Sequence, residues 1–133
     1  MTPPTEAHDA RYLEGIRHFN TGDYFEAHEV WEDLWHECDP ADRRFYQGLI
    51  QAAVSLYHAG NGNWRGAHRL FHAAMTKLAD YEPSYREMNV VGFRESLRLS
   101  MPWTSEYKEP VDPIMITERI PVILLARSSE ADV

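Results

Sequence analysis

Two pairs of side chains at helical spacing are the clearest candidates for chemistry in this 133-residue sequence. His28 and Glu32 are four positions apart, as are His68 and His72. Residues at positions i and i+4 of a helix lie on the same face, about 5–6 Å apart between their Cβ atoms. Each pair could therefore supply two ligands to one divalent metal ion. The His28–Glu32 pair could instead be a general base with its orienting carboxylate.

Both pairs also have an ordinary structural interpretation. Glu32 stands where the zinc-peptidase pattern His-Glu-x-x-His requires its second histidine, so that pattern is not formed. A hydrogen bond between His28 and Glu32 could close a contact between two helices, and His68 and His72 could lie on the surface. If a twofold axis related two halves of the chain, all four side chains could converge on one metal site, whereas stacking by translation would keep them apart. We therefore predict no cofactor and keep a divalent metal ion as an open alternative.

A third group of polar residues lies along a long apolar segment. From Phe45 to Asn63 the sequence contains no Asp, Glu, Lys or Arg, and apolar residues cover well over half of the helical wheel, which predicts a central, buried helix. A buried amide or imidazole without a partner costs about 1–3 kcal/mol, so the polar residues must face water, a ligand or a neighbouring helix. They fall in one narrow stripe: Arg44, Gln47, Gln51, Ser55 and His58.

Local signals predict the helices that position these residues. Gly22 and Gly62 follow the ends of two helices, and Asp23 and Asn63 cap the helices that come next. Asp39 and Pro40 mark the start of the central helix, and Asn89 marks the start of the last one. The predicted helices cover about residues 6–20, 24–37, 40–59, 64–81 and 90–101.

The C-terminal residues differ in kind from the rest. Prolines at positions 110, 113 and 121 oppose a long helix. The run Val-Ile-Leu-Leu at residues 122–125 is apolar and unfavourable to expose to water. We therefore divide the chain into a helical bundle domain, residues 1–101, and an extended arm, residues 102–133, that packs on the bundle or on a second subunit. A homodimer to which the arm contributes is the predicted assembly.

An offset of 40 residues relates two parts of the predicted bundle. Gly-Asp-Tyr at residues 22–24 corresponds to Gly-Asn-Trp at residues 62–64, and Ala27 corresponds to Ala67. The first of these segments resembles the turn and second helix of a tetratricopeptide-repeat hairpin, although that repeat has a period of about 34 residues. We therefore predict an all-α fold: a bundle of two tetratricopeptide-like helical hairpins with a short fifth helix and the extended C-terminal arm.

The composition narrows the classes of partner. The formal net charge is −8, which argues against a nucleic-acid backbone as the partner. No apolar run approaches the roughly 20 residues that span a bilayer, and the polar N-terminus has no signal-peptide core, so we expect a cytoplasmic protein with no membrane partner. Eleven Arg against two Lys, with abundant Asp and Glu, is typical either of adaptation to high salt or of a GC-rich genome.

Three short patterns occur in order along the chain. The first is Asn-x-Gly-x-Tyr-Phe-Glu-Ala-His-Glu, followed by Glu and Trp; the second is Gly-Leu-Ile-Gln; the third is Asn before Gly-Ala. Their residues are Asn20, Gly22, Phe25, Glu26, His28, Glu29, Glu32, Trp35, Gly48, Leu49, Ile50, Gln51, Asn63, Gly66 and Ala67. Through them, residues 12–99 resemble the uncharacterised prokaryotic family known as domain of unknown function 309. The resemblance implies a compact helical bundle and supplies no activity.

Two functional hypotheses follow, and the sequence leaves both open. The first is a small helical binding or interaction module, with a polar-lined groove between the second and third helices for a protein or a small polar ligand. The alternative is a small metal-dependent hydrolytic enzyme that uses His28, Glu32 and His58. The residues predicted to line the groove are His28, Glu32, Trp35, Arg44, Gln47, Gln51 and His58.

Overall fold

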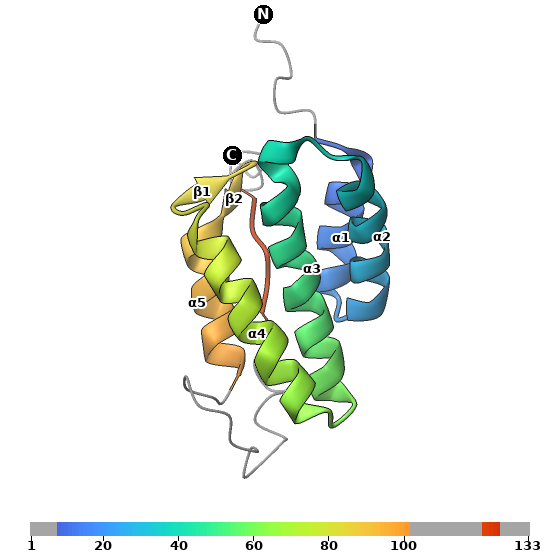
Figure 1. The fold of residues 1–133 in the computed structure, drawn as a ribbon, viewed down its shortest axis with the longest axis vertical. Helices are drawn as coiled ribbons and strands as arrows, with labels where there is room; N and C mark the ends of the chain where they lie inside the picture. The colour runs from blue at the N-terminus through green and yellow to red at the C-terminus, as the bar shows by residue number, and fades with distance from the viewer. Residues whose placement is uncertain (1–7, 102–120, 126–133) are drawn as a thin grey trace, which may run out of the picture.

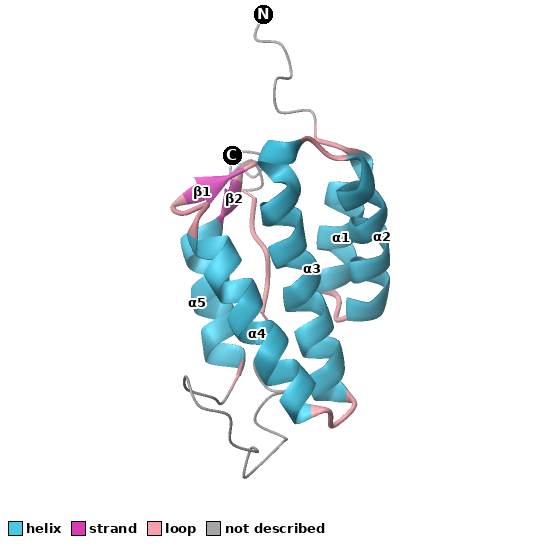
Figure 2. Cartoon of the chain, in the orientation of Figure 1, coloured by secondary structure: helices cyan, strands magenta, loops and turns pink. Residues whose placement is uncertain are grey.

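The computed structural model describes residues 8–101 and 121–125, and these form a helical bundle (Figure 1). The all-α prediction is confirmed, because the β structure of these residues is limited to a short antiparallel ribbon (Figure 2) and one isolated bridge between Met88 and Leu125. The elements in chain order are α1 (Ala10–Asn20), α2 (Tyr24–Glu37), α3 (Pro40–Gly60), α4 (Trp64–Ala79), β1 (Ser84–Tyr85), β2 (Met88–Asn89) and α5 (Val90–Ser100).

Most helix boundaries agree with their local signals. The carboxylate of Asp9 accepts a hydrogen bond from the Arg11 N–H at 2.9 Å, so α1 begins at Ala10 and not near residue 6. Asn89 caps α5 in the same way, by accepting from the Gly92 N–H at 2.9 Å. Helix α4 ends at Ala79, two residues before the predicted end. None of the described helices has the length and apolar character that a membrane span requires.

Helix α3 is the central helix of the bundle, as its uncharged sequence predicts. It packs against α2 on one side and against α4 on the other, while α1 packs on α2 and α5 packs on α4 (Figure 1). The core contains large side chains from every helix, and most of these side chains are fully buried. They include Tyr12, Phe19, Trp31, Phe45, Leu49, Phe71, Leu78, Phe93 and Leu97.

The turns that join α1 to α2 and α3 to α4 share one backbone geometry. Gly22 and Gly62 have φ values of 85° and 77°, a left-handed region that a glycine occupies without strain. The N–H of Asp23 donates to the His18 carbonyl at 2.9 Å, and the corresponding bond after Gly62 is 2.8 Å long. The 40-residue offset therefore holds in the backbone of the two turns, while the likeness to tetratricopeptide hairpins stays a prediction.

A C-terminal segment, residues 121–125, lies on the bundle of its own chain (red in Figure 1). The amide side chain of Asn20 holds the backbone of Ile123, accepting from its N–H at 2.8 Å and donating to its carbonyl at 3.0 Å. Pro121 and Ile123 are buried, whereas Val122 and Leu124 are 43% and 63% exposed. The rest of the predicted arm lies outside the described residues, so the proposed domain division stays a prediction.

Candidate functional site

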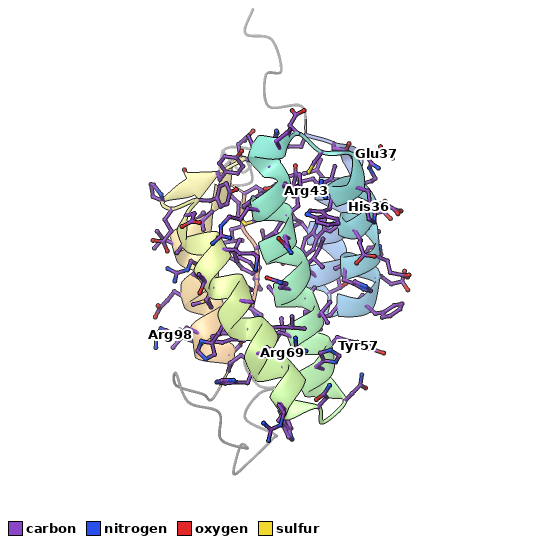
Figure 3. The ribbon with its side chains drawn as sticks, in the orientation of Figure 1. His36, Glu37, Arg43, Tyr57, Arg69 and Arg98 are labelled. Atoms are coloured by element: carbon purple, nitrogen blue, oxygen red, sulfur yellow. The ribbon has the colours of Figure 1, made fainter. Side chains whose placement is uncertain are left out.

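The polar residues of α3 divide between two sides of the helix. Towards α2, the Arg43 guanidinium lies 4.1 Å from the centre of the Trp35 ring, and Tyr57 contacts Phe25 (Figure 3). Gln47 follows Arg43 by about one helical turn, so it lies next to Arg43 on this side of α3. We define the α2–α3 face by these side chains and their α2 neighbours: Phe25, His28, Glu29, Glu32, Trp35, Arg43, Gln47 and Tyr57.

Arg44 lies towards α4 on the other side of the helix. Arg44 forms an ion pair with Asp80 at the C-terminal cap of α4, with 2.6 Å between Nε and Oδ2. Gln51 and His58 lie close to whole helical turns from both Gln47 and Arg44, so they stand between the two sides of α3. Arg44 is thus paired with α4, while the predicted groove as a whole stays a prediction. A helical wheel places residues on one stripe, but only the packing of α4 decides which neighbour that stripe meets.

His28 and Glu32 do not pair with each other. The Nδ1 atom of His28 lies 2.7 Å from the Phe25 carbonyl oxygen of its own helix, and its ring packs edge-on against the Phe25 ring. Glu32 is exposed and makes no hydrogen bond or ion pair with the described part of the chain. Expecting Glu32 to close a buried contact between helices was wrong, because Trp31 and Leu34 occupy the inward face of α2.

The candidate metal ligands also remain in separate pairs. His68 and His72 stack with 4.5 Å between ring centroids on α4, while His28 and Glu32 lie on α2, with α3 between the two helices (Figure 1). Among the residues that the structure describes, no three His, Cys, Asp or Glu side chains are grouped closely enough to hold a metal ion. The convergent four-residue site is therefore not formed by these side chains, and the metal-dependent enzyme stays a prediction.

Three buried polar atoms along α2 and α3 have no hydrogen-bond partner among the described residues: Trp35 Nε1, Gln51 Oε1 and Ser55 Oγ. Most buried polar groups in proteins are paired. The indole N–H of Trp35 lies beneath Arg43, a flexible and exposed side chain.

A second region, which the sequence did not predict, is a polar pocket of about 400 Å³ at one end of the bundle. We call it the end pocket. It forms where α1 begins, α2 ends and α3 begins, and the loop between β1 and β2 closes one side of it. Its lining residues are His8, Asp9, Arg11, Leu34, Glu37, Cys38, Asp39, Asp42, Tyr46 and Arg86.

Asp42 is the buried charge that organises this pocket. Its carboxylate is 4% exposed and accepts hydrogen bonds from Arg86 at 2.6 and 3.1 Å and from the Tyr85 hydroxyl at 2.6 Å. Burial alone would raise the pKa of Asp42, but these hydrogen bonds outweigh burial and hold the pKa below its usual value. The pocket wall is therefore fixed by an ionised carboxylate paired with a guanidinium.

The loop that carries Arg86 has an unusual backbone. Arg86 and Glu87 have φ values of 46° and 63°, as in the tight turns of hairpins where Asn and Gly normally stand. The Tyr12 hydroxyl donates to the Arg86 carbonyl at 3.0 Å and secures the loop against α1. The sequence could not predict the contact between Asp42 and Arg86, because the loop lacks the Asn and Gly that normally indicate such a turn.

Comparison with known proteins identifies the family of one segment. Residues 12–70 match the family described as domain of unknown function (DUF309). This match confirms the predicted family for that segment. The matched residues run from α1 into α4, so they include both sides of the α2–α3 face and only part of the end pocket.

Two relatives are described as uncharacterised proteins. YpuF of Bacillus subtilis is 46% identical over 61 residues, which are 44% of this chain and 35% of YpuF. A protein of Aquifex aeolicus is 30% identical over 80 residues, which are 59% of this chain and 24% of the relative. The matches thus span about a third and a quarter of the relatives' own lengths, and the shared segment is a helical unit whose activity has not been established.

Proposed function

We propose that the chain is a helical binding module that recognises another protein at the α2–α3 face. The observation that carries the proposal is an exposed aromatic pair. Phe25 and Tyr57 are 44% and 40% exposed, and their rings are 5.3 Å apart although they come from different helices. Contiguous exposed apolar surface is typical of interaction sites, and aromatic side chains supply much of the binding energy in such sites.

The charges around this pair indicate the chemistry of the partner. Glu29 and Glu32 follow Phe25 along the same stripe of α2, and both are exposed. A partner that places an apolar side chain between the two rings would therefore benefit from Lys or Arg beside it. The proposed partner is a basic, amphipathic helical segment. Trp35 and Gln47 extend the face with hydrogen-bonding groups at the far end.

The proposal is tested by a titration followed by NMR. The probe is a synthetic amphipathic helix of Leu and Lys, and the control peptide has Glu in place of Lys. We expect saturable shift changes around Phe25 and Tyr57 with the Lys peptide alone. The double variant Phe25→Ser, Tyr57→Ser should bind about tenfold more weakly. Leu13→Ser changes an equally exposed apolar residue of α1, 39% exposed, and should bind as the wild type does.

Two results would contradict the module. One is equal binding of the Glu peptide, which would show that Glu29 and Glu32 do not select a basic partner. The other is an equal loss of binding in Leu13→Ser, which would show that the peptide adheres to any exposed apolar side chain. Circular dichroism should show that the double variant is folded, so that a loss of binding is not caused by a loss of structure.

We further propose a homodimer through the C-terminal segment. Val122 and Leu124 face outward and line a groove of about 320 Å³ beside α5. Val91 and Leu99 of α5 are each 48% exposed, so α5 carries further exposed apolar side chains. The double variant Val122→Lys, Leu124→Lys should be monomeric by light scattering, while Phe25→Ser should leave the dimer intact. A full chain that is monomeric at micromolar concentration would overturn the dimer.

A further inference from the structure

We propose that the end pocket binds a primary amine in its charged ammonium form. This site is separate from the α2–α3 face and does not depend on the function proposed for that face. The volume of about 400 Å³ lies within the range of small-molecule sites. Its wall comes from three helices and the β1–β2 loop, elements that the rest of the fold already holds in place.

The charges that line the end pocket favour a cation. The four carboxylates of Asp9, Glu37, Asp39 and Asp42 face only two guanidinium groups, which leaves an excess of two negative charges. The guanidinium groups are also engaged. Arg86 holds Asp42 through two hydrogen bonds, and Arg11 holds Asp9 through two at 3.0 Å. An anion would find these donors occupied, whereas a cation would find carboxylate oxygens available.

The carboxylate of Asp39 is the main available acceptor. It makes no side-chain hydrogen bond within the described part of the chain, although Asp39 stands at the N-cap of α3. Glu37 contacts Arg11 with one oxygen at 3.2 Å, and its side chain is 70% exposed. Both groups lie at the junction of α2 and α3, where an ammonium group could reach them together.

A buried tyrosine whose hydroxyl is unbonded within the described part of the chain is the independent sign of a ligand. Tyr46 is 3% exposed and lines the pocket, yet its hydroxyl makes no hydrogen bond among the described residues. The hydroxyl of a buried tyrosine usually has a partner. An ammonium group could donate a hydrogen bond to this oxygen, since a hydroxyl oxygen can accept one.

His8 adds a second incomplete group to the wall. Its side chain is 5% exposed, and its Nε2 lies 3.1 Å from Glu87 Oε1. Its Nδ1 is buried without a partner among the described residues. When Nε2 carries the proton that Glu87 accepts, Nδ1 of the neutral ring is an acceptor. His8 Nδ1 is therefore an acceptor and the Tyr46 hydroxyl can accept as well, so a ligand rich in donors fits both.

The amine could be a free small molecule or the side chain of a lysine in a partner protein. The same ammonium chemistry serves both, and the aliphatic stem of either would lie against Leu34 and Cys38. The experiment therefore uses one probe for each source: n-butylamine for a free amine and a capped lysine, blocked at both backbone ends, for a side chain. Butyrate has the same stem with the opposite charge and is the control ligand.

Titrations at low ionic strength, followed by NMR, test the site. At least one amine should cause saturable shifts at the amides around Asp39 and Tyr46, and butyrate should cause none. Tyr46→Phe removes only the unpaired hydroxyl, and Asp39→Asn removes one charge. Each should weaken binding about tenfold. Glu26→Gln removes an exposed charge in the first turn of α2, away from both the end pocket and the α2–α3 face, and is the matched control.

The outcomes separate clearly. Binding of n-butylamine supports a free amine, and binding of the capped lysine alone supports a lysine side chain. Three results would overturn the proposal: no saturable binding of either amine, equal binding of butyrate, or an equal loss of affinity in Glu26→Gln. The last would mean that the amine responds to the overall negative charge of the protein and not to this pocket. Either variant, Tyr46→Phe or Asp39→Asn, is sufficient for this test, provided that it keeps the helix content of the wild type.

Discussion

The α1–α2 and α3–α4 hairpins share a turn but differ in how they are tied to the rest of the molecule. In the first hairpin the Trp31 Nε1–H donates to the Tyr12 carbonyl at 3.2 Å, directly above Gly15. Forty residues later, Phe71 and Ser55 occupy the places of Trp31 and Gly15. Phe71 has no ring N–H to donate, so this tie is absent from the second hairpin.

The difference extends to the residue just before each turn. Asn20 of the first hairpin binds the backbone of Ile123, whereas Gly60 stands at the corresponding position of the second and has no side chain. One backbone turn is thus compatible with different sets of contacts. We therefore expect the same kind of substitution to change the free energy of unfolding by different amounts in the two hairpins. The following predictions test that difference.

The largest effect is expected where the hairpins begin. Asp42, in the first turn of α3, is buried and paired with Arg86, whereas Asp9, at the cap of α1, pairs with Arg11 near the surface. Asp42→Ala removes a buried carboxylate and leaves the Tyr85 hydroxyl and the partly exposed Arg86 guanidinium without their partner, so it should cost about 3–4 kcal/mol of unfolding free energy. Asp9→Ala should cost about 1 kcal/mol. Urea denaturation measures both. Similar losses in the two variants would show that Asp42 is not the organising charge.

The next contrast concerns the helix contact inside each hairpin. A Cβ atom on Gly15 would lie 2.0 Å from Trp31 Nε1, so Gly15→Ala must displace the indole and its hydrogen bond. We expect a loss of about 3 kcal/mol. Ser55→Ala at the matched position removes a buried hydroxyl without a partner and should be neutral or stabilising by about 1 kcal/mol. If Ser55→Ala destabilised the protein, the Ser55 hydroxyl would have a hydrogen-bond partner in the folded state, and this prediction would be wrong.

Acid should reduce the contribution of Asp42. Because the pKa of Asp42 is lowered in the folded state, the unfolded chain takes up the proton first as the pH falls. The stabilisation is complete above the unfolded pKa of about 3.9 and is lost as the pH falls through the folded pKa. The difference in urea midpoint between the wild type and Asp42→Asn should therefore shrink below about pH 4. A difference that stays constant would place the role of Asp42 in packing and not in charge.

The sequence predicts local features of the fold well, because their causes lie within a few residues. Gly22 and Gly62 permit the positive φ of each turn, and Asn89 caps the helix that follows it. The central position of α3 also follows from the uncharged, largely apolar run that begins at Phe45. These features need no knowledge of distant contacts, and each of them is present in the structure.

The site is less predictable, because it depends on contacts between distant residues. Arg43 and Arg44 are adjacent in sequence, yet one covers Trp35 of α2 and the other pairs with Asp80 of α4. The wall of the end pocket is formed by the ion pair between Asp42 and Arg86. Arg86 reaches Asp42 from the β1–β2 turn, which has positive φ values although it contains no glycine. Helical spacing groups residues into stripes, but the rotation of each helix against its neighbours is fixed only by tertiary packing.

The smallest contrast lies at the caps that follow the two turns. The Asn63 side chain accepts from the Gly66 N–H at 3.1 Å, whereas Asp23 makes no such bond and accepts from the Thr21 hydroxyl at 3.2 Å instead. Asn63→Ala should therefore cost about 1 kcal/mol, and Asp23→Ala should stay within about 0.5 kcal/mol of the wild type. Thermal and urea denaturation of the two variants give the comparison.

A second substitution shows whether this cap acts through its contact with Gly66. A Cβ atom on Gly66 would lie 2.7 Å from Asn63 Nδ2, so Gly66→Ala should disturb the cap in the wild type. In an Asn63→Ala background the obstructing amide is gone, and the same change should cost less or even stabilise α4, because alanine favours helix over glycine by about 1 kcal/mol. Equal effects of Gly66→Ala in both backgrounds would mean that the two residues do not interact. The difference between the two hairpins would then rest on the Trp31 and Asn20 contacts alone.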